Sequence, residues 1–423
     1  MVVNAETDKQ WTPGTGALTL LCVGHGVTHF VFAATIMLLP YIRQDGGLSY
    51  TEAASLGTIY YIAAFIANFF SGYWVDAAGK RVMVQLAAVL MSGGGVIAAG
   101  LAGYVLDGFS LFIVLAIGWA FSGMGNQAWH PAAFSYLAKY YDDRRSFVFS
   151  IHVVAANVGD AVFPLIAGFL LGHVFVTAAG QALWQPVAIF GGIPCLVVAV
   201  VLVVYLMPRD REIIGGPPKS MSAKSYFEGY GALLKNKNAM LLALVAGLRN
   251  ASQTALLYFL PLYMVDVIQT GPVLVGIALT LLQVGGIIGA PIAGYAADRT
   301  GARPVVFACL TLTTIILVVA LFVKQPTHFV VVIAFMGFAL YAVRPVVQSW
   351  MMDLVPEDFR GSATSVMFGV QSAMNVVFLS VAGPIADAYS LVTVFYIIAG
   401  VILVANILTF ALPKETGRKQ VSA

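Results

Sequence analysis

Charged residues are scarce in this chain of 423 residues, and their scarcity excludes a water-soluble fold. Lys, Arg, Asp and Glu together make up 10% of the residues, against about 25% in an ordinary soluble domain. Hydrophobic residues make up 60%, so too few polar side chains remain to cover a surface that faces water. Apolar runs such as residues 196–206 and 315–323 do not alternate with polar residues, which excludes a membrane β-barrel. We therefore expect an all-α integral membrane protein.

The sequence also lacks the motifs of ATP-driven and hydrolytic chemistry. It contains no phosphate-binding Walker motif, no His-Glu-x-x-His zinc motif and no Gly-x-Ser-x-Gly nucleophile element. The three cysteines fall in apolar segments, are odd in number and lack metal or redox spacing, so we interpret them as inert packing residues. These absences disfavour an enzyme and an ATP-driven pump. A non-transporting sensor or an intramembrane enzyme is kept as a minor alternative.

The sequence does contain a series of apolar windows, each long enough for the roughly 20 residues of a membrane-spanning helix. The first 16 residues are polar and hold no apolar core, so no cleavable signal peptide is expected. Twelve spans are predicted, at residues 17–42, 52–75, 81–105, 110–138, 146–172, 184–207, 239–265, 272–297, 303–323, 329–354, 360–386 and 391–412.

The basic residues predict the orientation of these spans. Cytoplasmic loops carry the excess of Lys and Arg in membrane proteins. With both termini in the cytoplasm, 18 of the 22 basic residues fall on the cytoplasmic side, whereas Arg43 and Lys324 fall outside and Arg249 and Arg344 lie within spans. We therefore predict cytoplasmic N- and C-termini. The net charge of +3 reflects this topology, and no nucleic-acid binding is expected.

A short motif occurs twice, 222 positions apart, and predicts two similar halves. The pattern Gly-x-x-x-Asp-x-x-Gly-x-Arg begins at Gly72 and again at Gly294. Such duplication is how many secondary transporters are built. A polar segment rich in Gly and Pro separates the halves and is typical of a linker. The predicted units are an N-terminal six-helix bundle, a cytoplasmic linker and a C-terminal six-helix bundle, at residues 1–207, 208–238 and 239–423.

Proline-containing elements also match between the halves. Leu39-Pro40 is expected to close the first span, and Leu260-Pro261 the seventh. His130-Pro131 in the fourth span matches Arg344-Pro345 in the tenth, so in both a basic residue precedes a proline. Proline removes a backbone donor and locally opens a helix, and irregular backbone at membrane depth normally lines a cavity.

Twelve helices in two halves, with this motif after the second and eighth spans, resemble the major facilitator superfamily over nearly the whole chain. The resemblance implies two bundles around a central cavity, lined by the first, fourth, seventh and tenth helices, that rock between inward- and outward-open states. It also implies that Asp76 and its repeat Asp298 are gating residues, with Arg81 as a basic partner. A nearby helix dipole and charge-assisted hydrogen bonds would stabilise these carboxylates. The alternative is that these charges only set topology and loop turns.

A narrower resemblance rests on three spans. The segments Asn126–Ala133 (Asn-Gln-Ala-Trp-His-Pro-Ala-Ala), Asn157–Asp160 and Leu248–Asn250 are similar to the fosmidomycin-resistance branch, whose members are proton-coupled bacterial exporters. Two features depart from the exporter pattern: Trp119 stands where an arginine belongs, and the fifth-span antiporter signature lacks two glycines. Antiport is therefore favoured but not established.

Ionisable groups inside apolar spans are costly and by default indicate a transport pathway or a proton relay. Asp160 is the acid that lies deep in a span, and we predict it to be a proton-coupling residue, with His130 and His152 as relays. The alternatives are an Asp160 that is held permanently by a hydrogen bond across a helix interface, and a His152 that is simply packed.

His25 and His29 are four residues apart and therefore share one face of the first span. We predict both as polar groups of the substrate-binding cavity. Such a pair could bind a metal, but the sequence places no third ligand at helical spacing nearby. No metal site is therefore expected.

Arg249 and Arg344 retain their charge and each require an anionic partner in the apolar core. That partner is Asp160, the substrate, or both in turn. Two arginines and several histidines against one acid predict an electropositive cavity and an anionic substrate, such as a carboxylate or phosphonate. The predicted substrate-binding site is completed by Trp129, Asn126, Gln127 and Asn157.

These observations predict a multi-pass secondary transporter of a bacterial-type cytoplasmic membrane. The expected activity is export of a small organic, anionic or amphiphilic compound, such as a drug or phosphonate, in exchange for protons. Uptake of an organic anion by proton symport is the alternative. The expected partners are the small-molecule substrate and the lipid bilayer, with the proton as coupling ion, no other cofactor and a monomeric state.

Overall fold

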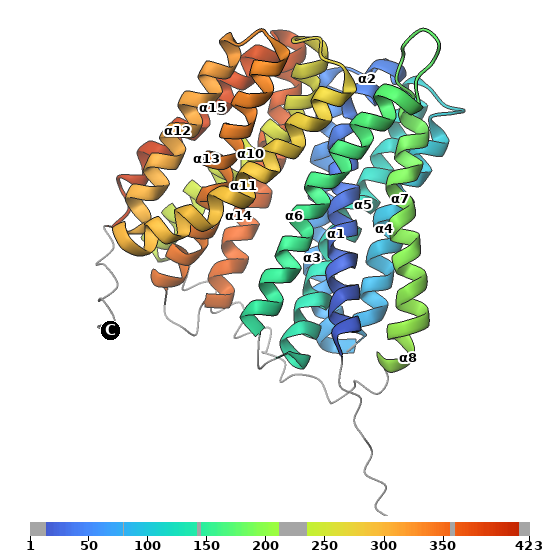
Figure 1. Ribbon diagram of the computed structural model, residues 1–423. Coiled ribbons are helices and arrows are strands. Elements are labelled where there is room, and N and C mark those ends of the chain that lie inside the picture. The colour runs from blue at the N-terminus through green and yellow to red at the C-terminus, as the bar shows by residue number, and fades with distance from the viewer. Residues whose placement is uncertain (1–13, 79, 142–144, 211–234, 356–359, 414–423) are drawn as a thin grey trace, which may run out of the picture.

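The computed structural model describes residues 14–78, 80–141, 145–210, 235–355 and 360–413, and these are almost entirely helical (Figure 1). Eleven helices among the described residues are long and apolar enough to cross a membrane, and α3 (Tyr50–Ala78) is a further helix of 29 residues. The other long helices are α1 (Thr15–Met37), α4 (Arg81–Ala102), α5 (Gly108–Tyr140), α6 (Arg145–Phe169), α7 (Trp184–Val201), α10 (Lys237–Asp266), α11 (Pro272–Thr300), α12 (Ala302–Phe322), α13 (Pro326–Asp353), α14 (Arg360–Ala388) and α15 (Leu391–Thr409).

The predicted fold class, two pseudo-symmetric six-helix bundles, is confirmed. Within the first half α1 packs on α6, α3 on α5 and α4 on α7, and the second half repeats these pairs as α10 with α14, α11 with α13 and α12 with α15. The halves meet along two seams, where α6 packs against α11 and α3 against α14. The predicted linker, residues 208–238, lies mostly outside the described residues, so its boundaries stay a prediction.

Two predicted helix ends are wrong. Leu39-Pro40 does not close the first span, because α1 ends at Met37 and a second helix, α2 (Leu39–Gly46), follows with the proline in its first turn. Proline is tolerated there, where its missing N–H has no helical partner. The helix α2 ends at Gly47, whose φ of 63° favours glycine. In the second half Pro261 lies inside α10, which continues to Asp266.

Glycines bring helix backbones together in both the first half and the contact between halves. A Cβ on Gly159 of α6 would collide with the carbonyl oxygen of Gly26 on α1. A Cβ on Gly276 of α11 would collide with the carbonyl oxygen of Pro164 on α6. Small residues favour such close approach because lipid supplies little hydrophobic drive, so packing itself must stabilise helix association.

Side-chain hydrogen bonds join the two bundles at the end of the molecule opposite the linker. We call the end that carries the N-termini of α1 and α10 the linker end, and the opposite end, which carries α2, the far end (Figure 1). At the far end Asp266 of α10 accepts hydrogen bonds from Arg43 at 2.8 Å, from Gln44 at 3.0 Å and from the Tyr50 hydroxyl at 3.0 Å. A single carboxylate of the second half therefore binds three side chains of the first.

A second carboxylate at the far end stabilises the contact between α3 and α14. Asp387 of α14 accepts from the backbone N–H groups of Tyr50 and Thr51 at 2.9 and 2.8 Å, and from the Thr51 hydroxyl at 2.5 Å. Because these are the first residues of α3, Asp387 caps a helix of the opposite half. The ribbons of the two bundles converge at the far end and spread toward the linker end (Figure 1).

Replacement of Gly159 by Ala tests the close approach of α1 and α6. The added methyl group meets α1 backbone atoms, which cannot turn aside as a flexible side chain can, so we expect a loss of about 1–3 kcal/mol of stability. Thermal unfolding of the purified protein in detergent measures it. Gly400→Ala in α15 is the matched control, since nothing lies within 4 Å of a Cβ there; an equal decrease in both variants would contradict the packing argument.

Candidate functional site

Four histidines and one aspartate from three helices of the first half gather in the interior of that bundle. His25 and His29 come from α1, His130 from α5, and His152 and Asp160 from α6. The ring centroid of His25 lies 4.9 Å from that of His29, 4.8 Å from that of His130 and 4.0 Å from that of His152, on which it stacks. We call these five residues the histidine cluster.

Hydrogen bonds fix one ring nitrogen of three histidines in the cluster. His29 Nδ1 lies 3.0 Å from Asp160 Oδ2, and these groups form an ion pair when the histidine is protonated. His25 Nδ1 lies 2.7 Å from the carbonyl oxygen of His152. His130 Nδ1 lies 2.9 Å from the carbonyl oxygen of Asn126, one turn earlier on α5. Carbonyl oxygens only accept, so the last two Nδ1 atoms donate.

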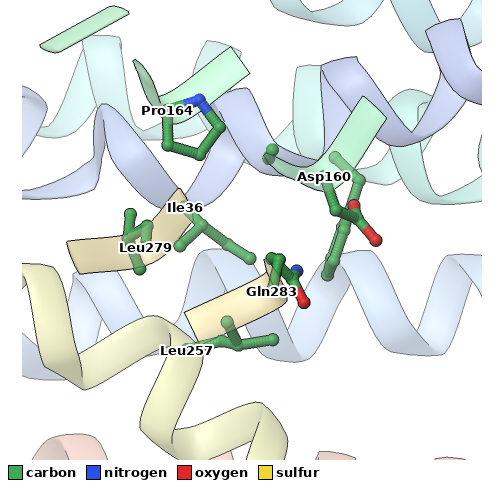
Figure 2. Close-up of a pocket in the computed structure, with 8 residues that line it drawn as sticks. Ile36, Asp160, Pro164, Leu257, Leu279 and Gln283 are labelled. Carbon is green, nitrogen blue, oxygen red and sulfur yellow. The ribbon is translucent and has the colours of Figure 1, made fainter. Parts of the chain in front are cut away.

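Asp160 connects this cluster to the contact between the halves. Its side chain is 12% exposed, and its Oδ1 has no hydrogen-bond partner among the described residues. It lines a small pocket that is shared by helices of both halves. Figure 2 shows its carboxylate on the same side of this pocket as the Gln283 amide of α11, with Ile36, Pro164 and Leu257 around them. The predicted coupling residue therefore lies at an interface that must rearrange if the halves move.

The two arginines have different surroundings, and neither forms an ion pair with Asp160 among the described residues. Arg249 on α10 is 3% exposed and donates from Nε at 3.2 Å and from Nη2 at 2.5 Å to the carbonyl oxygen of Leu340 on α13. Arg344 is exposed, and its charge acts on Arg249 and, across the halves, on His130. Arg249 is thus satisfied by backbone, whereas Arg344 is available to an anion.

The structure relates these contacts to the internal repeat. His29 and Asp160 pair α1 with α6, and at the corresponding place in the second half Asn250 donates to Asn375 at 3.0 Å and pairs α10 with α14. These partners are 221 and 215 positions apart in sequence, as the repeat requires. The same contact is therefore ionisable in the first half and uncharged in the second.

The remaining predicted substrate-binding residues lie around the cluster. Trp129 is fully buried, and its ring fills the space that a Cβ on Gly24 would occupy, so it packs α5 on α1. Asn126 is buried and supplies the carbonyl for His130. Gln127 and Asn157 are half-buried.

Sequence reasoning missed Gln283, which is half-buried and lines the same pocket as Asp160. A polar side chain in the apolar run of α11 was the available signal. It also missed Asp266 and Asp387, because acids near span ends are unremarkable in a sequence.

The three predicted gating residues are spread over different surroundings. The side chain of Asp76 lies outside those the structure describes. Arg81 is buried and donates from Nε to the Ser135 hydroxyl at 2.7 Å, which joins α4 to α5 within one half. Asp298 is exposed at the linker end of α11. The gating roles stay predictions.

Comparison with known proteins supplies the family. The family model of the Major Facilitator Superfamily matches residues 21–274 and 242–423. The membrane sensor protein UhpC of Escherichia coli K12 is 24% identical over 82% of this chain and 80% of its own length. The probable hexose phosphate transport protein of Chlamydia pneumoniae is 20% identical over 66% of this chain and 63% of its own length. The multidrug efflux pump Tap of Mycolicibacterium fortuitum is 26% identical over 63% of each chain.

A solved structure has the same fold. A bacterial homologue of the human lysosomal transporter Spinster, in an inward-facing and unoccupied conformation, superposes with a TM-score of 0.77 at 15% identity, over 94% of this chain and 96% of that one. The family match covers most of the chain, and the helices and their pairing agree with it. The protein is therefore a multi-pass membrane protein of the major facilitator superfamily, a family of transport proteins rather than enzymes.

Proposed function

We propose that the protein is a proton-coupled secondary transporter that works by alternating access and exports a small organic, anionic or amphiphilic compound. The observation that carries this proposal is the contact of His29 with Asp160, a residue that lines the pocket between the two halves. A carboxylate that exchanges a proton at such a place can link proton movement to the rocking of the bundles. In the second half the equivalent pair, Asn250 and Asn375, carries no exchangeable charge.

The charges of the site support an organic anion as substrate. Arg344 is exposed, and among the described residues neither it nor Arg249 forms an ion pair. Entry of an anion beside Arg344 adds the negative charge that the two arginines lack. The relatives point the same way in part, since one is named a hexose phosphate transport protein and another a multidrug efflux pump.

The proposed cycle uses the closure seen at the far end. With the linker end in the cytoplasm of a bacterial-type cell, the present arrangement is closed to the outside by Asp266 and Asp387. Protonation at Asp160, relayed by His130 or His152, weakens its pairing with His29 and so links proton uptake to the rearrangement of the two halves. Return to the inward-open arrangement releases the proton. The transporter acts as a monomer, since each chain contains both halves.

Two other functions remain as alternatives. Uptake of an organic anion by proton symport uses the same residues and differs in the direction of coupled flux. A membrane sensor is the second alternative, and the UhpC relative, which is named a sensor, favours it. A sensor would bind its ligand without moving it across the bilayer.

Proteoliposomes with an imposed pH gradient and an internal pH dye test the proposal. Phosphonates, carboxylates and lipophilic drugs are added in turn, and we expect substrate-dependent proton flux opposite to the flux of at least one organic anion. Proton flux in the same direction would establish symport instead. Saturable binding of a ligand to folded protein without any flux would establish a sensor.

Asp160→Asn removes the exchangeable proton while keeping the shape of the side chain. We expect transport driven by a pH gradient to fall at least 100-fold, whereas exchange of labelled for unlabelled substrate continues because no net proton movement is needed. Asp107→Asn is the matched control, because Asp107 is exposed at the start of α5 and its side chain makes no capping hydrogen bond. Loss of exchange in folded Asp160→Asn protein would contradict the coupling role.

Asp266→Asn tests whether the far end opens during the cycle. The charge-assisted bond from Arg43 contributes about 1.5–3 kcal/mol, so its loss shifts the population toward a far-end-open state by roughly tenfold or more. Spin labels at the exposed positions Val105 and Tyr389, in a variant without native cysteines, should report a longer distance component by double electron–electron resonance.

Asp45→Asn is the control for this experiment. Asp45 accepts from Trp184 and Gln185 at 2.8 Å each, and both donors belong to the same half as Asp45. The distance between the labels should therefore stay unchanged in this variant. An unchanged distance in Asp266→Asn, or an equal change in both variants, would contradict the gate.

A further inference from the structure

Three ring nitrogens of the histidine cluster converge on one point, and the fold brings them there from two helices. His25 and His29 are one turn apart on α1, and His130 reaches them from α5. One nitrogen from each ring lies within 4.8 Å of the others. The sequence alone offered only two ligands at helical spacing, because the third is separated from them by more than 100 residues.

The hydrogen bonds of the Nδ1 atoms, on the side of each ring away from this point, determine whether the converging nitrogens carry a proton or a lone pair. At His25 and His130 the Nδ1 atom faces a backbone carbonyl, which can only accept, so Nδ1 bears the proton. The Nε2 atom of each neutral ring is then left with a lone pair. These two Nε2 atoms face each other at 3.2 Å. Two lone pairs at this separation cannot bond to each other, but a proton or a metal cation placed between them would bond to both.

His29 repeats this arrangement with a stronger outer partner. Its Nδ1 faces the Asp160 carboxylate, and its Nε2 is buried without a hydrogen-bond partner among the described residues. Metal-binding histidines characteristically donate their second nitrogen to a carboxylate or a backbone carbonyl, which fixes the ring and raises its basicity. All three histidines of this group have such an outer partner.

We propose that His25, His29 and His130 form a binding site for a divalent transition-metal ion such as Zn²⁺. Three neutral imidazoles and an open fourth position are a recognised zinc coordination set, and imidazole also suits Cu²⁺ and Ni²⁺. Nitrogens bound to one tetrahedral zinc at 2.0–2.1 Å lie about 3.3 Å apart, close to the 3.2 Å between His25 and His130. A small rotation of the His29 ring about its bond to Asp160 brings in the third ligand.

The surroundings of the group suit an exchangeable ion. The His29 side chain is 20% exposed and that of Asp160 12% exposed, so the group is not sealed from solvent, and Asp160 lines the small pocket between the halves. The Asp160 carboxylate offsets part of the charge of the ion without ligating it. His152 stacks on His25 and contributes its carbonyl, so it acts as a positioning residue.

This metal site goes beyond the proposed transport function and does not depend on it. Binding of the ion is an equilibrium property of the folded protein and needs no gradient, whereas transport is assayed with a chelator present. If proton-coupled transport fails and metal binding succeeds, only the transport proposal is lost. If transport succeeds and metal binding fails, only the metal-site proposal is lost.

Isothermal titration of tag-free protein in detergent with Zn²⁺ tests the proposal, with Co²⁺ as a spectroscopic probe. We expect one ion per chain and, for Co²⁺, the visible absorption of a four-coordinate nitrogen site. Replacement of one ligand, by His25→Ala or His130→Asn, should lower the affinity at least 100-fold. Asp160→Asn, which changes only an outer partner, should lower it about 10–100-fold.

The matched control is the double variant His173→Ala/His328→Ala, which removes the two histidines outside the cluster and should keep full affinity. Thermal unfolding provides a second readout, since Zn²⁺ should raise the unfolding temperature of the wild type and the control but not of folded His25→Ala protein. Absence of stoichiometric binding would overturn the proposal. Affinity that survives both ligand substitutions, or that is lost in the control, would also overturn it by assigning the ion to other residues.

Discussion

The contact between His29 and Asp160 is the interaction around which the candidate site is organised. An ionisable pair in an apolar bundle is stable only when its remaining polar atoms are satisfied or reach a polar space. Here Asp160 also lines the pocket between the halves, and one ring nitrogen of His29 lies within 4.8 Å of those of two further histidines. The pair therefore connects the packed interior of one bundle to the surface along which the bundles meet.

The two bundles are alike in packing and unlike in charge. Equivalent helices pair in both, and the contact between α1 and α6 recurs between α10 and α14. A second correspondence concerns the prolines of α5 and α13. In each helix, the backbone carbonyl five residues before the proline accepts a hydrogen bond from a basic side chain. His130 donates to the carbonyl of Asn126 in α5, and Arg249 donates to the carbonyl of Leu340 in α13. The two halves therefore share this backbone geometry, but different basic side chains donate to the equivalent carbonyls.

The fold was predictable from the sequence because the bilayer imposes it. Long apolar windows must be helical, and the repeated motif and the basic residues order them into two halves. The break at Leu38 was not predictable, because a proline at this place fits both the end of one helix and the first turn of the next. The candidate site residues could also be predicted from the sequence, since few ionisable residues lie within the spans.

Which site residues contact one another could not be predicted in the same way. Helical spacing places His25 and His29 on one face, but it says nothing of His130, which is brought by packing of α5 against α1. Arg249 seemed to need an anion, and the structure gives it a backbone carbonyl instead. Contacts between residues that are distant in sequence depend on helix rotation and tilt, and neither leaves a local pattern.

The bond from Arg249 to Leu340 has a consequence for the electric field inside the protein. Because the guanidinium is held by the backbone of a neighbouring helix in the same bundle, its position does not depend on how the bundles are tilted. The second half therefore carries a constant positive potential toward the interface, whichever side of the membrane the pocket faces. Against that fixed background, a change of charge in the first half alone changes the potential that a passing molecule meets.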